Sequence, residues 1–172
     1  TPLAYMKGTG DAVAASFAEL TGKYSVTDMF LGRIGGSLGE VSALCLILGG
    51  AYLIWRKVIN WQTPVAYIGT VAILTFLFPQ HGMGNLDWML YSIFGGGLML
   101  GAFFMATDYT TSPMTRKGRI VMGIGCGLLT ALIRAFGGYP EGVSFSILLM
   151  NICVPLIDRV TMPKIYGEVK SK

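Results

Sequence analysis

The stretch FFMATDYTTSPMTRKGR (residues 103–119) begins as an apolar run, then presents an acid, Asp108, and ends in a basic cluster. An apolar run that stops at a basic group is typical of a membrane-spanning segment at the cytoplasmic face. A carboxylate beside hydrocarbon is costly and is usually paired, hydrated or functional. The stretch therefore predicts a membrane protein and makes Asp108 a candidate functional residue.

The whole chain has the composition of a membrane protein. Of its 172 residues, 53% are hydrophobic and only 13% are charged, and its mean hydropathy is +0.60, whereas soluble domains carry roughly a quarter charged residues. The net charge of +4 does not indicate nucleic-acid binding, because the Lys and Arg residues fall in short groups between apolar segments. The sequence contains no P-loop, dinucleotide fingerprint or hydrolase elbow, so it predicts no catalytic residue.

Five apolar segments predict an all-α polytopic fold with five transmembrane helices. At about 1.5 Å per residue these segments are slightly short for a hydrocarbon core of about 30 Å, unless the helices extend into the polar flanks. The two segments of 15 residues could instead be half-inserted helices that line a cavity. The segments are 38–55, 64–78, 89–106, 120–136 and 143–157.

The positions of Lys and Arg predict the orientation of these helices. Basic groups follow the first, third and fifth segments, and positive charge collects on the cytoplasmic side of membranes. We therefore expect an extracytoplasmic segment at 1–37, a transmembrane domain at 38–158 and a cytoplasmic tail at 159–172. Because the chain begins at Thr1 without Met or a signal-peptide pattern, we also expect it to be part of a longer polypeptide.

Four acids at the predicted membrane edges are candidates for an ion path. Asp108 and Asp158 would face the cytoplasm, and Glu40 and Glu141 would face outward. Structural alternatives stay open at this stage. Asp108 could close a turn with the hydroxyls of Thr110, Thr111 and Ser112, or it could pair with Arg116. Asp158 could pair with Arg159 or with lipid headgroups. Arg134, near the outer end of the fourth segment, could snorkel to the interface or pair with Glu141.

The 24 glycines fall partly at the small-xxx-small spacing that lets helices approach closely in lipid. Three pairs have this spacing: Gly35 and Gly39, Gly97 and Gly101, Gly123 and Gly127. We interpret GGGLMLG (residues 95–101) as a helix-packing run inside a span, and we expect a break at GGSLGE (residues 35–40).

The cysteines and the histidine do not form a metal-binding pattern. Cys45, Cys126 and Cys153 are far apart in the sequence and lie in apolar segments, so we expect packing residues. The alternative is an iron–sulfur ligand shared with another subunit. His81 has no ligand partner at suitable spacing and is expected to be a loop residue. No metal site is predicted.

Several motifs together resemble the RnfD/NqrB family, and ATDYTTSP favours its RnfD branch, the membrane subunit of the Rnf complex. They are GGSLGEVSAL (35–44), FFMATDYTTSP (103–113), IRAFGGYPEGVSFSILLMN (133–151) and PLID (155–158). The resemblance implies a ten-helix, two-repeat bundle similar to urea transporters, of which this chain would be the C-terminal half. It also implies the cytoplasmic (inner) membrane of a bacterium or archaeon, and the A, B, C, E and G subunits of the Rnf complex as partners.

The resemblance further implies an FMN joined through its phosphate to a threonine outside the membrane, and Thr1 would be that threonine. A second, noncovalent flavin, riboflavin, is implied without an assigned residue. The implied function is electron relay between ferredoxin and NAD carriers coupled to Na⁺ or H⁺ translocation. The alternatives are the NqrB component of the Na⁺-translocating NADH:quinone reductase, a flavin-free urea- or ammonium-like transporter, and a purely structural assembly subunit.

Overall fold

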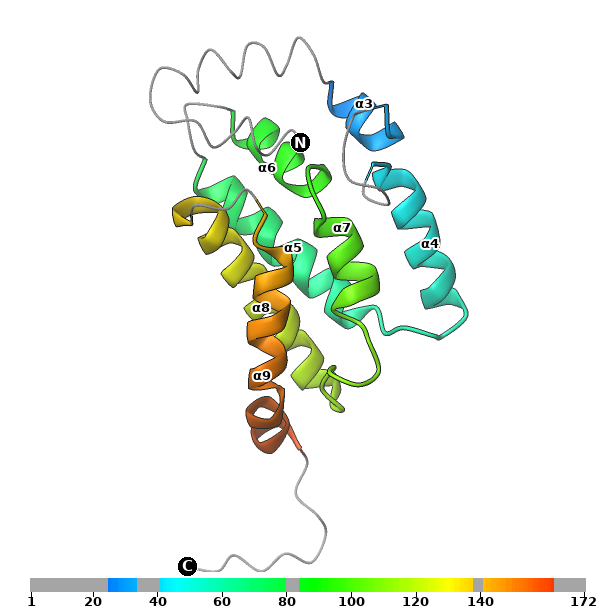
Figure 1. The fold of residues 1–172 in the computed structure, drawn as a ribbon, viewed down its shortest axis with the longest axis vertical. Helices are drawn as coiled ribbons and strands as arrows, with labels where there is room; N and C mark the ends of the chain where they lie inside the picture. The colour runs from blue at the N-terminus through cyan, green and yellow to red at the C-terminus, as the bar shows by residue number, and fades with distance from the viewer. Residues whose placement is uncertain (1–24, 34–40, 80–83, 138–140, 163–172) are drawn as a thin grey trace, which may run out of the picture.

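The computed structural model describes residues 25–33, 41–79, 84–137 and 141–162, and within these ranges all regular structure is helical (Figure 1). Helices α8 and α9 are each long and apolar enough to cross a membrane, and a bent pair of shorter helices would make a third span. Helices α4 and α5 are apolar but shorter. The structure therefore supports the predicted all-α membrane protein.

Each of the five predicted segments contains a helix, with shifted ends. The elements are α3 (Val26–Leu31), α4 (Ala43–Trp55), α5 (Gln62–Leu77), α6 (Asn85–Phe94), α7 (Leu98–Leu100), the π-helix η1 (Gly101–Met105), α8 (Arg116–Phe136) and α9 (Val143–Thr161). The predicted segments at 120–136 and 143–157 were too short, because α8 begins at Arg116 and α9 continues to Thr161. The predicted continuous span at 89–106 was wrong, since a break separates α6 from α7.

Hydroxyl side chains at the residue just before the helix explain where two of these helices begin. The Thr115 hydroxyl accepts a hydrogen bond from the Gly118 N–H at 2.9 Å, and the Ser42 hydroxyl accepts one from the Cys45 N–H at 3.3 Å. Each hydroxyl satisfies one of the amide groups that lack a partner in the first helical turn. Arg116 therefore belongs to the first turn of α8, not to a loop.

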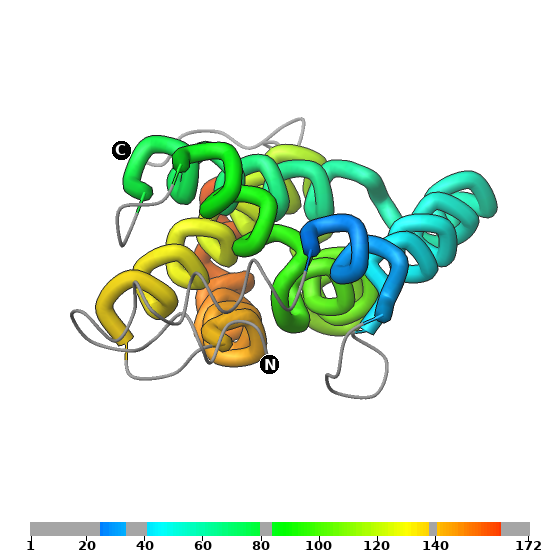
Figure 2. Tube along the Cα trace, turned by 90° about the horizontal axis from the view of Figure 1, so that it is seen from above, coloured from blue at the N-terminus to red at the C-terminus, as the bar shows by residue number. Residues whose placement is uncertain are grey.

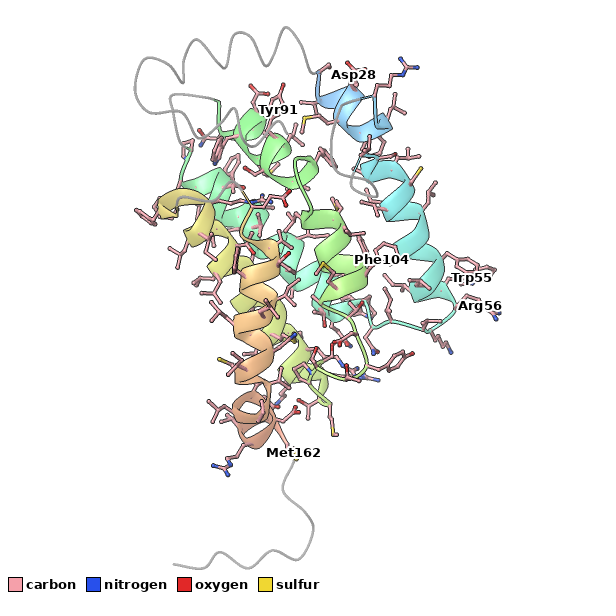
Figure 3. The ribbon with its side chains drawn as sticks, viewed as in Figure 1. Asp28, Trp55, Arg56, Tyr91, Phe104 and Met162 are labelled. Carbon is pink, nitrogen blue, oxygen red and sulfur yellow. The ribbon has the colours of Figure 1, made fainter. Side chains whose placement is uncertain are left out.

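Helices α8 and α9 lie at one edge of the bundle and α4 lies at the other, with α7 and η1 between them (Figures 1 and 2). Apolar side chains of α5, α7, α8 and α9 contribute to the buried core. At the lower end of α4 in Figure 3, Trp55 and Arg56 project away from the bundle, and Trp55 is 78% exposed. An aromatic residue beside a base at a helix end is typical of a membrane interface.

Helix α5 packs closely against α8, where two glycines of α8 lie on the α5 backbone. A Cβ atom on Gly123 would lie 2.8 Å from the Thr63 carbonyl oxygen and 2.7 Å from the Ala66 Cβ. One on Gly127 would lie 2.9 Å from the Tyr67 carbonyl oxygen. The small-xxx-small prediction for Gly123 and Gly127 is therefore confirmed, and this contact brings the side chains of the two helices together.

Substituting alanine at Gly123 should destabilise the protein, because its Cβ would meet backbone atoms that cannot move aside. Overpacking of this kind costs about 1–3 kcal/mol. Gly69→Ala on α5 is the matched control, since a Cβ there meets nothing within 4 Å, and alanine gains up to ~1 kcal/mol of helix propensity. Thermal unfolding of the purified full-length subunit in detergent should show a lower midpoint for Gly123→Ala only. Equal midpoints for the two variants would contradict the close contact.

Candidate functional site

The third predicted span is interrupted at the three glycines 95–97. Helix α6 ends at Phe94, α7 begins at Leu98, and the axes of the two halves differ by 62°. Gly96 has φ +70°, a left-handed conformation that favours glycine. Our interpretation of GGGLMLG as a packing run is therefore wrong for its first three glycines. It is right for Gly101, where an added Cβ would overlap the Val143 side chain of α9.

Arg134 on α8 caps the C-terminal end of α6. Its Nη1 donates a hydrogen bond to the Ser92 carbonyl, one of the last carbonyls of α6, which have no partner within the helix. The side chain is 8% exposed, so it does not snorkel to solvent, and within the described residues it forms no ion pair with Glu141. A positive charge at a helix C-terminus also interacts favourably with the helix dipole.

Glu141 caps the N-terminal end of the other half of the broken span, where α7 begins. Its Oε1 accepts a hydrogen bond of 3.0 Å from the Gly97 N–H, where α7 begins. A carboxylate at this position complements the partial positive charge of a helix N-terminus. Arg134 and Glu141 therefore bind the two ends of one broken span, and both lie close to the connection between α8 and α9.

Three buried hydroxyls meet between α5, α8 and α9, and one of them, Thr130, lies one helical turn before Arg134 on α8. The Tyr67 Oη is 2.7 Å from Thr130 Oγ1 and 3.0 Å from Ser146 Oγ, and the latter two atoms are 2.7 Å apart. The Ser146 hydroxyl also donates to the Val143 carbonyl at 2.8 Å. None of the three residues has any exposed surface. A closed polar cluster of this kind joins three helices in a core that is otherwise mostly apolar.

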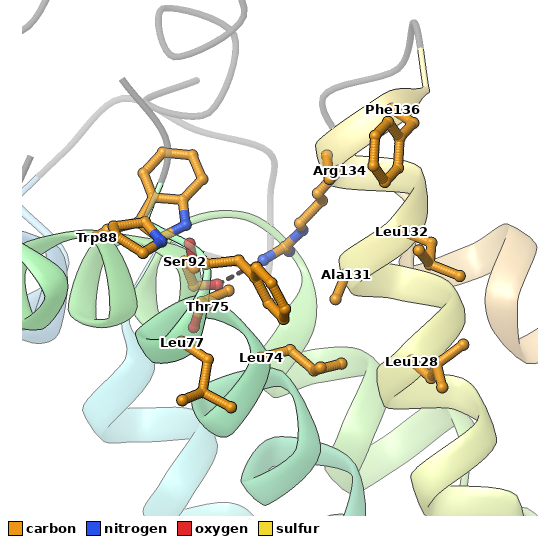
Figure 4. A pocket seen from close by; sticks show the side chains of 13 residues that line it. Leu74, Thr75, Leu77, Trp88, Ser92, Leu128, Ala131, Leu132, Arg134 and Phe136 are labelled. Carbon is orange, nitrogen blue, oxygen red and sulfur yellow. Dashed lines mark hydrogen bonds between the residues drawn. The ribbon is translucent and has the colours of Figure 1, made fainter. Parts of the chain in front are cut away.

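A cavity of about 590 Å³ lies beside the break, between the end of α5, α6 and α8 (Figure 4). Its wall is mostly apolar, and Figure 4 shows the Arg134 guanidinium extending across it towards Ser92. Leu74 and Leu132 belong to the apolar wall, and Trp88 lies at the far side. The cavity therefore combines one buried cation with a hydrophobic surface.

Asp108 closes a turn with the residues that follow it, which is the structural alternative to a role in an ion path. Its carboxylate accepts hydrogen bonds from the hydroxyls of Thr110 and Thr111 and from the Thr111 N–H. Ser112 instead donates to the Ala106 carbonyl, and no ion pair joins Asp108 to Arg116 in the described part of the chain. A role of Asp108 in an ion path stays a prediction.

Asp158 holds the same polar loop to α9. Its Oδ1 accepts a hydrogen bond of 3.1 Å from the Met114 N–H, so it uses a backbone partner in the loop before α8. Thr115 and Thr161, 2.7 Å apart, join the loop to α9 a second time. The structure thus places Asp108 within this loop and Asp158 against it, at the end of the bundle opposite Glu141.

The remaining candidates either lie outside the described residues or form no metal site within them. Thr1, Glu40, His81 and the expected break at 35–40 lie outside the described residues. Cys45, Cys126 and Cys153 are free thiols, and the described residues contain no group of three metal-ligating side chains. The alternative of an iron–sulfur ligand from this chain gains no support from them.

Sequence reasoning missed the hydroxyl cluster and the cap on α6. The available signal was on α8, where Thr130 and Arg134 are four residues apart and so share a face with Cys126 and Met122. Two polar residues on a buried helix face of a membrane protein must find partners inside the bundle. Their partners, Tyr67 and Ser92, could not be identified without the helix packing.

The chain matches the model of the NQR2, RnfD, RnfE family over residues 1–167. It is 48% identical over 174 residues to the D subunit of the Na⁺-translocating ferredoxin:NAD⁺ oxidoreductase complex of Acetobacterium woodii, covering 100% of this chain and 50% of the relative. It is 56% identical over 140 residues to the D subunit of the proton-translocating ferredoxin:NAD⁺ oxidoreductase complex of Clostridium ljungdahlii, covering 81% and 42%.

A third relative has a less specific description. The D subunit of the ion-translocating oxidoreductase complex of Stutzerimonas stutzeri is 46% identical over 154 residues, which are 87% of this chain and 42% of the relative. The chain therefore spans about half the length of the curated relatives it matches.

Removing the Glu141 carboxylate should loosen the second half of the broken span. Glu141→Ala leaves the Gly97 N–H without its acceptor, at a cost of about 1–3 kcal/mol if the amide stays buried. Glu141→Gln keeps an acceptor and loses only the charge, worth about 0.3–1 kcal/mol. Hydrogen–deuterium exchange of the full-length subunit should therefore accelerate slightly at residues 97–101 in Glu141→Gln and more strongly in Glu141→Ala. Unchanged exchange in both variants would contradict this capping role, and α5 provides the internal reference.

Proposed function

This chain belongs to the NQR2, RnfD, RnfE family, and from that membership we propose that it forms the C-terminal half of RnfD, the membrane subunit of an Rnf-type ferredoxin:NAD oxidoreductase complex. In this role the subunit relays electrons through a covalent FMN while the complex moves Na⁺ or H⁺ out of the cell. The subunit is not catalytic alone, and the A, B, C, E and G subunits of the Rnf complex are its partners.

The similarity to relatives named as the D subunit carries this proposal, because it extends over most or all of the chain. The chain covers about half of each relative, which agrees with one five-helix half of a ten-helix bundle similar to urea transporters. Basic residues lie just after α4, at the start of α8 and at the end of α9, and they support a cytoplasmic C-terminus. Thr1 would then lie outside the membrane.

The broken span supports a role in moving an ion or a substrate. Discontinuous helices are common where transporters hold their cargo, because the ends of half-helices present backbone groups inside the membrane. Here Arg134 and Glu141 occupy the two ends. Glu141 and Glu40 would serve the outer end of an ion path, and Asp108 and Asp158 the inner end. A polar cavity of about 110 Å³ beside Asp108 is large enough for water.

The FMN proposal rests on the sequence resemblance, since Thr1 lies outside the described residues. A threonine hydroxyl is the kind of group that can form a phosphoester, which would hold the carrier in place. When bound, FMN supplies one-electron and two-electron redox chemistry, and the protein tunes it through burial and hydrogen bonds. No described residue is assigned to FMN or to riboflavin.

Replacing Thr1 should remove the covalent flavin. In the full-length subunit, Thr1→Ala should abolish the flavin-fluorescent band seen after denaturing electrophoresis, because the hydroxyl that forms the phosphoester is gone. Thr9→Ala is the control and should keep the fluorescence. Protein staining of the same gel shows that the polypeptide is present. Fluorescence that survives in Thr1→Ala would reject the site, and a colourless wild-type subunit would favour the flavin-free transporter.

Removing the Asp108 charge should depress ion-coupled activity of the intact complex more than assembly. Asp108→Asn removes the negative charge but keeps an oxygen that can accept the Thr110 and Thr111 hydroxyls. Thr111→Val is the matched control, since it disturbs the turn and keeps the carboxylate. Ion uptake into vesicles and the yield of assembled complex are the two measurements. A similar loss of both quantities in the two variants would return Asp108 to a turn residue.

A further inference from the structure

The cavity beside the broken span has the features of a lipid site. We propose that it binds one anionic phospholipid, whose phosphate is held by Arg134 and whose acyl chain lies along Leu128 and Leu132 (Figure 4). The proposal depends on the membrane location of the helices and not on the flavin or on the ion that is moved. Three features support it: the charge of Arg134, its depth in the bundle and the exposure of the cavity wall.

The guanidinium of Arg134 has donors that an anion would satisfy. Its Nη1 donates to the Ser92 carbonyl, but Nε and Nη2 have no hydrogen-bond partner among the described residues although they are buried. Glu141 attracts the guanidinium electrostatically but is hydrogen-bonded to the Gly97 N–H, and in that part of the chain it forms no ion pair with Arg134. Buried donors of a charged group are rarely left without acceptors. A phosphate offers several acceptor oxygens that match the guanidinium geometry.

The depth of the charge matches a headgroup. Arg134 is two residues from the end of α8 at Phe136, which corresponds to about 3 Å along the helix axis. Leu128 lies six residues before Arg134, about 9 Å further into the membrane. An anion at Arg134 would thus be at the membrane interface, and the apolar wall would continue from it into the hydrocarbon region.

The cavity wall is exposed on the side where lipid would enter. Leu128 is 44% exposed, Leu132 is 45% exposed and Phe78 is 69% exposed, and all three line the cavity. The volume of about 590 Å³ is within the range of roughly 300–1,000 Å³ for ligand pockets. Its largely apolar surface offers few partners for the hydroxyls of a flavin side chain, so an acyl chain fits it better.

The test uses the full-length subunit in its assembled complex, delipidated in detergent and then incubated with vesicles of phosphatidylcholine alone or with phosphatidylglycerol. Native mass spectrometry should show one phosphatidylglycerol retained per copy, in preference to phosphatidylcholine. Arg134→Met should reduce retention about tenfold or more, because the charge-assisted hydrogen bonds are lost. Arg134→Lys should restore part of it.

Two variants on α8 separate the cavity from the helix surface. Leu132→Trp fills the cavity without replacing Arg134 and should also displace the lipid. Ile124→Trp is the matched control, since Ile124 has a similar exposure of 46% and does not line the cavity. Equal retention of the two lipids by the wild type, or full retention by Leu132→Trp, would overturn the proposal. So would a flavin that is released by Leu132→Trp. If Arg134→Met fails to assemble, the comparison of the two tryptophan variants decides.

Discussion

The break at residues 95–97 imposes the constraint on which the rest of the bundle depends. A helix that stops within a packed bundle leaves backbone carbonyls and amides that need partners outside the helix. In this chain one arginine and one glutamate satisfy the two ends, each with the charge that the local helix dipole favours. Because both residues lie close to the connection between α8 and α9, the position of that hairpin fixes the position of the broken span.

The hairpin of α8 and α9 is held at both ends and in its middle. Gly123 and Gly127 let α8 lie on the backbone of α5, which brings Tyr67 within hydrogen-bonding distance of Thr130 and Ser146. At the opposite end from the break, Asp158 binds the Met114 N–H and so ties α9 to the loop before α8. Asp108, Asp158 and Glu141 were predicted to serve an ion path. Each also has a structural role, because its carboxylate accepts a hydrogen bond from a backbone N–H or a hydroxyl.

The sequence located the apolar helices because apolar length is a strong local signal in membrane proteins, although only α8, α9 and the bent pair meet the length and composition expected of a span. It also predicted the contact of Gly123 and Gly127, which depends on spacing along one helix. It failed at residues 95–97, because three glycines inside an apolar run are compatible both with close packing and with a break. The difference depends on Arg134 and Glu141, which are about 40 residues further along the chain. Local patterns do not show which distant side chain will cap an exposed backbone group.

The hydroxyl cluster has a consequence for its own protons. Tyr67, Thr130 and Ser146 carry three hydroxyl hydrogens, whereas the three contacts among them and the contact with the Val143 carbonyl make four short oxygen–oxygen distances. One of the four contacts therefore lacks a hydrogen, and rotation of the hydroxyls about their C–O bonds can change which contact this is without displacing a heavy atom. The hydrogens of this cluster can therefore be arranged in more than one way, while the oxygen framework that joins the three helices stays fixed.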